Sequence, residues 1–392
     1  MHKNWLAVCL ANFLIAALFG SMLRLSRLVP LGFEYSNFLH AHSHVAMLGW
    51  VYLVIFGLAV TVFVPDDSRQ RFGNLFWVTQ GSVIGMMVTF PLQGYAPASI
   101  TFSTLHILCA YVFAVRVWKF LPRGMFRTAL VFMVISTFGA WSLGVVGATL
   151  GKESAWYKVA IQFFLHFQFN GWFLIGGIAL LHRYLGRLGI CPNPRLVHCL
   201  GALLAASAVF TFGLPLQWSF GLPVFGVFNA VGAALQLGAL MLIAMIFKNV
   251  KKHLPPVSQS LAWLMILAGL SLLMKAVFQG LSTWPEIADA SLKVRPFAIG
   301  FIHLTMLGAV SGILLFLVGQ NFPVAQKSFS WKTGTALFCA GFIGTEALIF
   351  LQGFHEFARQ PQTTFFPVLL LGFTLLLTAG IGFFLAAAAN RT

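Results

Sequence analysis

The sequence predicts an all-α integral membrane protein, and its composition, its apolar runs and its charge distribution all point to that class. Hydrophobic residues make up 59% of the 392-residue chain and charged residues only 8%, with a mean hydropathy of +0.89. Soluble globular domains carry about 25% charged residues. A helix needs about 20 apolar residues to cross a bilayer, and runs of that length recur along this chain. A β-barrel would show alternating strands of about ten residues instead.

We expect twelve transmembrane helices because short polar stretches such as PDDSRQR and KNVKKHLPP divide the chain into that many apolar runs. The expected helices cover approximately residues 5–25, 41–64, 75–94, 100–118, 127–149, 157–181, 197–216, 223–247, 259–280, 297–319, 333–353 and 365–389. The first run lacks a small-residue cleavage site, so we expect a membrane anchor there and no signal peptide. No long linker interrupts the chain, and residues 1–392 are expected to form a single transmembrane domain.

The net charge of +16 would suit a nucleic-acid partner in a soluble protein, so the location of the charges decides its meaning. The two termini and the connections after the even-numbered helices carry sixteen of the 24 Lys and Arg residues. The positive-inside rule therefore predicts that both termini are cytoplasmic, in a bacterial inner membrane. The basic residues are therefore a topology signal, with contact to anionic membrane lipid expected in addition, and no nucleic-acid partner is implied.

Histidines are the candidate ligands of this chain, because its five cysteines show no CxxC spacing. The predicted topology places seven histidines near the outer, periplasmic face, and four others lie among cytoplasmic basic residues. Ionisable residues within a membrane are costly and are usually functional, and neutral imidazole binds transition metals and haem iron. The seven candidate metal ligands are His40, His42, His44, His106, His166, His303 and His355.

Two segments, HSHVAMLGWV from His42 and FIHLTMLGAV from Phe301, share the frame x-x-His-x-x-Met-Leu-Gly-x-Val. Both lie near the outer start of an even-numbered helix, which places His44 and His303 at matching heights. Two imidazoles at one height suit the two axial positions of a low-spin haem. Gly49 and Gly308 follow the histidines by five residues, where the lack of a side chain would leave room for a flat macrocycle.

At these residues the chain resembles the haem–copper oxidase superfamily, which includes the nitric oxide reductases. Its catalytic subunit has the same number of helices, both termini in the cytoplasm, and a low-spin haem held by histidines on the second and tenth helices. The resemblance implies that His44 and His303 bind haem b. It also implies an oxidoreductase supplied with electrons by a cytochrome c-type subunit or a quinol, acting on O₂ or NO.

The chain departs from that family at the second metal site. Phe301, in the run IGFIHLTMLG, stands where the high-spin haem ligand would be. The segment HFQFNGW resembles the reductase run His-x-x-x-Glu-Gly, but Asn170 replaces the glutamate. The outer loop LPLQWSFGLP lacks the expected pair of adjacent histidines. Either the chain keeps one haem and has lost gas chemistry, or other histidines hold a second haem, copper or non-haem iron.

The run LHAHSH leaves two further questions open. His40 and His44 are four residues apart and share a face if the helix begins early, so either suits as the axial ligand. His42 would point elsewhere, towards a second site. The same run is similar to the His-x-His core of the NnrS family of nitric-oxide-stress membrane proteins, although Ser43 replaces that family's glutamate. A haem or copper transporter is the remaining alternative.

Other polar residues at membrane depth are candidates for supporting roles. Glu346 in FIGTEALIF is either a proton-relay group or a structural acid, and Asn170 is the second candidate catalytic residue. Lys275 either extends its ammonium group outward or neutralises a haem propionate. Arg359 lies in the outer loop where the oxidases keep propionate-binding arginines, and His355 and Glu356 lie beside it.

Overall fold

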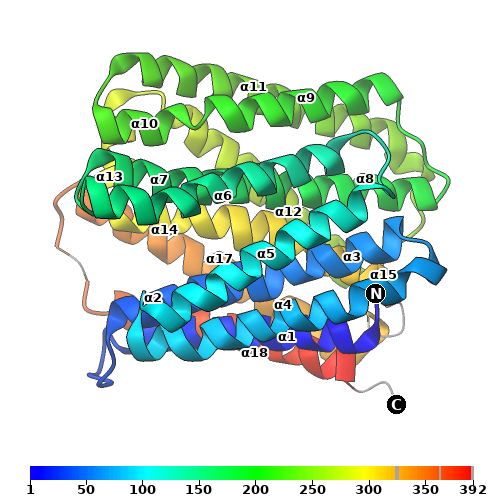
Figure 1. Ribbon diagram of the computed structural model, residues 1–392, viewed down its shortest axis with the longest axis horizontal. Helices are drawn as coiled ribbons and strands as arrows, with labels where there is room; N and C mark the ends of the chain where they lie inside the picture. Colours follow the sequence, from blue (N-terminus) through cyan, green and yellow to red (C-terminus); the bar gives the residue numbers. More distant parts are fainter. Residues whose placement is uncertain (323–325, 362, 390–392) are drawn as a thin grey trace. The chain divides into compact units, whose positions relative to one another are not determined.

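The computed structural model describes residues 1–322, 326–361 and 363–389, and these residues form helices and no strands (Figure 1). Within them, twelve helices are long and apolar enough to cross a membrane, which confirms the expected number. They are α1 (Lys3–Leu25), α2–η1–α3 (Tyr35–Phe63), α4 (Asp66–Gln93), α5 (Pro97–Trp118), α6 (Met125–Thr149), α7–η2–α8 (Ala155–Arg187), α9–α10 (Pro194–Phe220), α11–η3 (Pro223–His253), α12 (Gln259–Leu281), α14–η4–α15 (Arg295–Asn321), α17 (Phe329–Phe357) and α18 (Phe366–Ala389).

Most helices extend beyond the apolar runs that predicted them, because polar residues continue the helix outside the hydrocarbon core. The helix expected from residue 41 begins at Tyr35, and the helix expected from residue 75 begins at Asp66. Asp66 and Asp67 occupy the first turn of α4, where acidic side chains interact favourably with the helix dipole. Asp66 also forms an ion pair with Arg69. Hydropathy thus located the helices but placed several of their ends too far inward.

Three of the spanning helices contain a π-helical segment, and each segment directly follows a histidine. The segments are η1 (Val45–Tyr52), η2 (Phe167–Leu174) and η4 (Leu304–Val310). His44 ends α2 (Tyr35–His44), His166 ends α7 (Ala155–His166) and His303 ends α14 (Arg295–His303). π-Helical turns are rare and are often found at functional sites.

The chain packs as two compact units, each built from separate stretches of sequence. Unit 1 comprises Met1–Phe120, Val257–Leu267 and Ser311–Thr392, and unit 2 comprises Leu121–Pro256 and Ala268–Val310. Within unit 1, α1 packs against α2, η1 and α18, and α18 packs against α17; Figure 1 shows α1 in blue and α18 in red. Within unit 2, α6 packs against α7 and η2, η2 packs against η4, and α9 (Pro194–Phe210) packs against α11 (Pro223–Val250).

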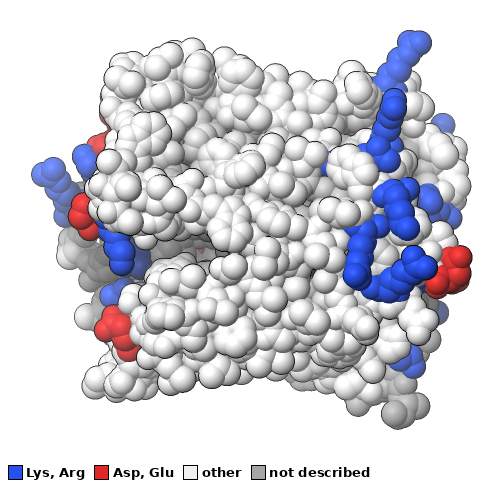
Figure 2. Space-filling model, in the orientation of Figure 1, with Lys and Arg blue, Asp and Glu red and all other residues white. Residues whose placement is uncertain are grey.

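Charged side chains lie near the ends of the helices, and the middle of the helices carries none on the face that Figure 2 shows. Large apolar side chains such as Val115, Val145 and Met241 are instead more than half exposed. This distribution suits lipid around the helix middles and water at their ends. The chain is therefore a multi-pass membrane protein.

The π-helical segment η1 is held to its neighbours in unit 1 by a buried pair of amides. Asn12 on α1 donates to the carbonyl oxygen of Gly49 at 2.9 Å and to Oε1 of Gln80 at 2.7 Å. Gln80 returns a hydrogen bond to Oδ1 of Asn12 at 3.1 Å. Without a Cβ, Gly49 lets these neighbours approach, because an added Cβ would lie 2.9 Å from Val83 and 3.1 Å from Asn12. Protein atoms thus occupy the space beside Gly49 that the sequence had suggested for a macrocycle.

Gly49→Ala is expected to lower the free energy of unfolding by about 1–3 kcal/mol, because the added methyl group overpacks the contact with Val83 and Asn12. Thermal unfolding of the purified protein in detergent measures this. Gly73→Ala on α4 is the matched control, since no atom lies within 4 Å of its added Cβ. Helix propensity predicts that the control is stabilised by up to about 1 kcal/mol. Equal effects of the two substitutions would contradict the close packing described here.

Candidate functional site

His40 and His44 lie on one face of α2, because the helix begins early enough to include both. The centroid of the His44 ring lies 4.3 Å from that of Phe90 and 5.9 Å from that of Tyr95. The His40 ring lies 4.6 Å from the same tyrosine. Both aromatic residues come from the end of α4 and the turn that follows it. The two imidazoles therefore share one aromatic environment in unit 1.

The ring of His44 is oriented by its own helix. Its Nδ1 lies 2.9 Å from the carbonyl oxygen of His40, and because a carbonyl only accepts, Nδ1 carries the proton. The lone pair of the neutral ring is then on Nε2. Histidines that bind metals usually donate their other N–H group to a carbonyl or carboxylate in this way. His44 is therefore arranged as a metal-binding histidine would be.

His42 points away from this pair and contacts α1. Its Nδ1 lies 2.8 Å from the carbonyl oxygen of Ala16, and an added Cβ on Gly20 would meet the imidazole at 3.1 Å. The lack of a side chain at Gly20 makes room for this ring. The structure thus gives His42 a backbone partner in unit 1.

His106 on α5 is the most deeply buried histidine of unit 1, with 3% of its surface exposed. It hydrogen-bonds to the backbone of Leu48 in η1 and interacts electrostatically with His44. The Tyr52 ring lies edge-on to the imidazole, with 4.6 Å between centroids. Nε2 of His106 is buried and has no hydrogen-bond partner among the described residues. His106 and His44 thus lie around the start of one π-helical segment.

In unit 2, His166 has both ring nitrogens close to protein groups. Its Nε2 donates to the carbonyl oxygen of Ala208 at 2.7 Å. Its Nδ1 lies 3.5 Å from Nδ2 of Asn170, which donates to the backbone oxygen of His166 at 3.1 Å. A metal ion would have to bind Nδ1, on the side of Asn170. The amide of Asn170 therefore controls access to this ring.

The segment after His166 repeats a spacing that the sequence interpretation had noted at only two places. Gly171 follows His166 by five residues, as Gly49 follows His44, and a tryptophan comes next in both segments. An added Cβ on Gly171 would lie 2.5 Å from Phe132 on α6, so this glycine permits close helix packing. The repeated spacing His-x4-Gly is visible in the sequence and would have predicted three equivalent segments.

Lys275 and Phe301 come together in unit 2, close to the position of His303 in the chain. Nζ of Lys275 lies 5.2 Å from the centroid of the Phe301 ring, and the lysine interacts electrostatically with His166. The side chain is only 2% exposed. A lysine that extends its ammonium group to the membrane surface would be far more exposed.

His355 lies near the C-terminal end of α17 (Phe329–Phe357), and Arg359 follows that helix. Nδ1 of His355 lies 3.3 Å from the carbonyl oxygen of Pro361, and both residues are near the surface. Arg359 adopts a positive φ of 54° and is exposed. Its side chain is therefore placed at the edge of unit 1, with solvent or lipid headgroups around it.

Glu346 has a basic neighbour that the sequence interpretation missed. Glu346 on α17 is buried, with 6% of its surface exposed, and Arg24 near the end of α1 interacts electrostatically with it. Tyr35, at the start of α2, is also within electrostatic range of Arg24. The signal in the sequence was an arginine inside an apolar helix end, in SMLRLSRL. Arg24 thus gives Glu346 a basic side chain within electrostatic range.

The candidate residues thus form separate groups. In unit 1, His40 and His44 share the ring of Tyr95, and His106 is within electrostatic range of His44. In unit 2, Asn170 contacts His166, and Lys275 is within electrostatic range of the same imidazole. Among the described residues, no group of three or more His, Cys, Asp and Glu side chains is close enough to hold a metal ion. The Nε2 lone pair of His44 fits a haem ligand. The space beside Gly49, however, is filled by protein atoms and leaves no room for a macrocycle.

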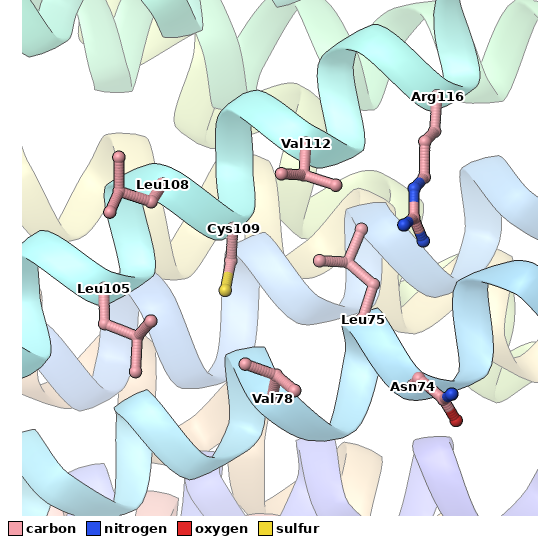
Figure 3. Close-up of a pocket in the computed structure, with 8 residues that line it drawn as sticks. All are labelled: Asn74, Leu75, Val78, Leu105, Leu108, Cys109, Val112 and Arg116. Atoms are coloured by element: carbon pink, nitrogen blue, oxygen red, sulfur yellow. The ribbon is translucent and has the colours of Figure 1, made fainter.

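A groove lies between α4 and α5 in unit 1 (Figure 3). Leucine and valine side chains line most of it, with Cys109 at its floor and Asn74 and Arg116 at one end. Val78, Leu108 and Val112 are each more than a third exposed. An apolar, open groove on the outside of a membrane protein suits a lipid chain, and it carries none of the candidate ligands.

Compared with protein-family models and with curated proteins, the sequence matches none of them.

Glu346→Gln is expected to destabilise the protein because it leaves the nearby Arg24 without a compensating charge. The double variant Arg24→Met/Glu346→Gln should lose less free energy of unfolding than the two single variants lose in sum. The expected difference is about 0.5–3 kcal/mol. Thermal unfolding of the four proteins in detergent completes the cycle. Additive losses would show that the two side chains do not interact.

Proposed function

We propose that the chain is a membrane-embedded b-type haem protein whose low-spin haem is bound by His44 and His303. The observation that carries this proposal is the matched placement of the two residues. Each histidine ends an α-helix, begins a π-helical segment and opens the same Met-Leu-Gly frame. π-Helical turns are rare and are frequently found at functional sites, so their occurrence at equivalent places in two helices supports a shared role.

Several properties of His44 support the proposed ligand role. Its protonated Nδ1 faces the carbonyl of His40, so Nε2 carries the lone pair that iron requires. Its ring packs against Phe90, which restricts its rotation. His40 has no such arrangement and supplies the oriented carbonyl instead. We therefore assign His44, not His40, as the axial ligand.

Bound haem would supply one-electron chemistry, with an electron donor such as a cytochrome c-type subunit or a quinol. A second haem, copper or non-haem iron at His106 or His166 would add O₂ or NO chemistry and make the protein an oxidoreductase. His106 has a buried nitrogen without a described partner, which favours it over the doubly engaged His166. Asn170 and Glu346 are the side chains proposed to handle protons or substrate there.

His44→Ala and His303→Ala are each expected to remove the narrow reduced α-band of a low-spin haem, because each takes away one axial ligand. A dithionite-reduced minus oxidised spectrum of the purified protein, with a pyridine haemochrome assay on the same sample, measures the loss. His198→Ala is the control, since this exposed histidine lies at the start of α9. It should keep the spectrum.

The outcomes separate the candidate functions. One haem and no other metal per chain supports electron transfer or sensing by a low-spin protein. Two haems, or one haem with a non-haem metal, supports a reductase. Unchanged spectra in both histidine variants would refute the axial pair. A wild-type protein without haem would refute the haem function and leave a transporter as the better reading.

We also propose that both termini are cytoplasmic in a bacterial inner membrane, with the haem towards the periplasmic side. The charge distribution supports this orientation. Cys191 is exposed in the connection between α8 (Ile175–Arg187) and α9, which this topology places in the cytoplasm. An impermeant maleimide is therefore expected to label Cys191 only after the membrane is opened.

A reciprocal variant provides the control for topology. In a Cys191→Ser/Cys199→Ser background, Gln360→Cys places an exposed thiol after α17, on the proposed outer side. That variant should be labelled in intact spheroplasts. Labelling of Cys191 before the membrane is opened, or failure at position 360 until it is opened, would reverse the orientation.

A further inference from the structure

Lys275 is a buried cation for which unit 2 provides no acidic partner. It lies on α12 (Gln259–Leu281), and only 2% of its surface is exposed. The ion pairs Arg69–Asp66 and Lys293–Asp289 do not involve Lys275, and both lie at exposed positions. An ammonium group removed from water without a compensating charge is strongly unfavourable. An anion that the protein itself does not supply would therefore stabilise the charged form of Lys275.

The nearest groups do not neutralise this charge. The face of the Phe301 ring, 5.2 Å away, attracts a cation but carries no net charge. His166 supplies no negative charge either, because an imidazole is neutral and, when protonated, repels the ammonium group. The environment of Nζ is thus apolar on one side and basic on the other.

The same face of α12 carries further hydrogen-bonding groups and no acid. Ser271 and Gln279 on α12, and Ser282 directly after the helix, are all buried and lie at helical spacing from Lys275. Gln279 donates to Oδ1 of Asn229 on α11 at 2.7 Å, and Asn229 donates to Oγ of Ser282 at 3.1 Å. These amides are satisfied by one another, so they hold α11 and α12 together and leave the ammonium donors of Lys275 for a ligand.

We propose that Lys275 binds the carboxylate of a ligand inside unit 2, beside Phe301 and His166. An ammonium group offers three donors, and a carboxylate supplies both the acceptors and the missing negative charge. Two sources have this chemistry. One is a carboxylate of a bound porphyrin, which rests on the proposed haem function, and the other is a free small carboxylate.

The test compares three probes on the full-length protein in detergent: protohaem, its dimethyl ester and formate. Lys275→Met is expected to weaken binding of protohaem by about tenfold or more, as loss of a charged hydrogen bond implies, and to leave binding of the ester unchanged. Lys275→Arg should retain the preference for the free acid. Lys158→Met, an exposed lysine of the same unit, is the matched control. Optical titration measures haem binding, and thermal unfolding measures formate binding.

The outcomes distinguish the two sources and the two proposals. Loss of the preference for the free acid over the ester in Lys275→Met supports a porphyrin carboxylate. Stabilisation of the wild type by formate that Lys275→Met loses supports a free carboxylate, even if no haem binds and the haem function fails. If haem binds and Lys275→Met binds all three probes as the wild type does, the proposed carboxylate site is overturned and the haem function stands.

A further measurement covers the case in which Lys275 is merely structural. The ligand-free Lys275→Met variant is expected to unfold at a higher temperature than the wild type, because it removes an uncompensated buried charge. A variant that unfolds at a lower temperature in the absence of ligand would overturn the proposal, since Lys275 would then have its partner within the protein.

Discussion

The constraint on which this structure depends is that polar groups inside a membrane must find their hydrogen-bond partners within the protein. This constraint applies at the π-helical segments in particular, because a π-helical turn changes which backbone groups are paired along the helix. In η1, Asn12 bonds to the carbonyl of Gly49, and His106 bonds to the backbone of Leu48. The buried polar side chains of unit 1 are thus arranged around the backbone of one irregular segment. Gly49 has no side chain because the helices that carry these partners must approach closely.

The same constraint explains the behaviour of the histidines. His42, His44 and His166 each place one ring nitrogen within hydrogen-bond distance of a carbonyl oxygen, those of Ala16, His40 and Ala208. Each bond fixes which nitrogen carries the proton. A histidine held in this way is satisfied structurally and also presents a defined lone pair on its other nitrogen. Structural and ligand roles are therefore compatible, and the contact that fixes the His44 ring is made within one helix.

The buried charges divide into two kinds. Glu346 interacts with Arg24 across α17 and α1, so each side chain reduces the cost of the other. Lys275 has only an aromatic ring and an imidazole beside it. An acid with an opposite charge in range costs less to bury than a cation without one, unless a ligand supplies the charge that the cation lacks. This difference separates a structural position in unit 1 from a binding position in unit 2.

The sequence by itself determined the class of the protein and the number and approximate positions of its helices, because crossing hydrocarbon requires about 20 apolar residues in a row. The helix period also indicated that His40 and His44 share a face, once α2 was found to begin at Tyr35. Helix ends, the π-helical segments and the partners of each ring nitrogen were not predictable. Only the tertiary structure decided that Asn12 and Val83 fill the space beside Gly49, that Arg24 accompanies Glu346, and that Lys275 is buried. The physical reason is that these contacts join helices distant in the chain, whereas hydropathy and periodicity describe each helix alone.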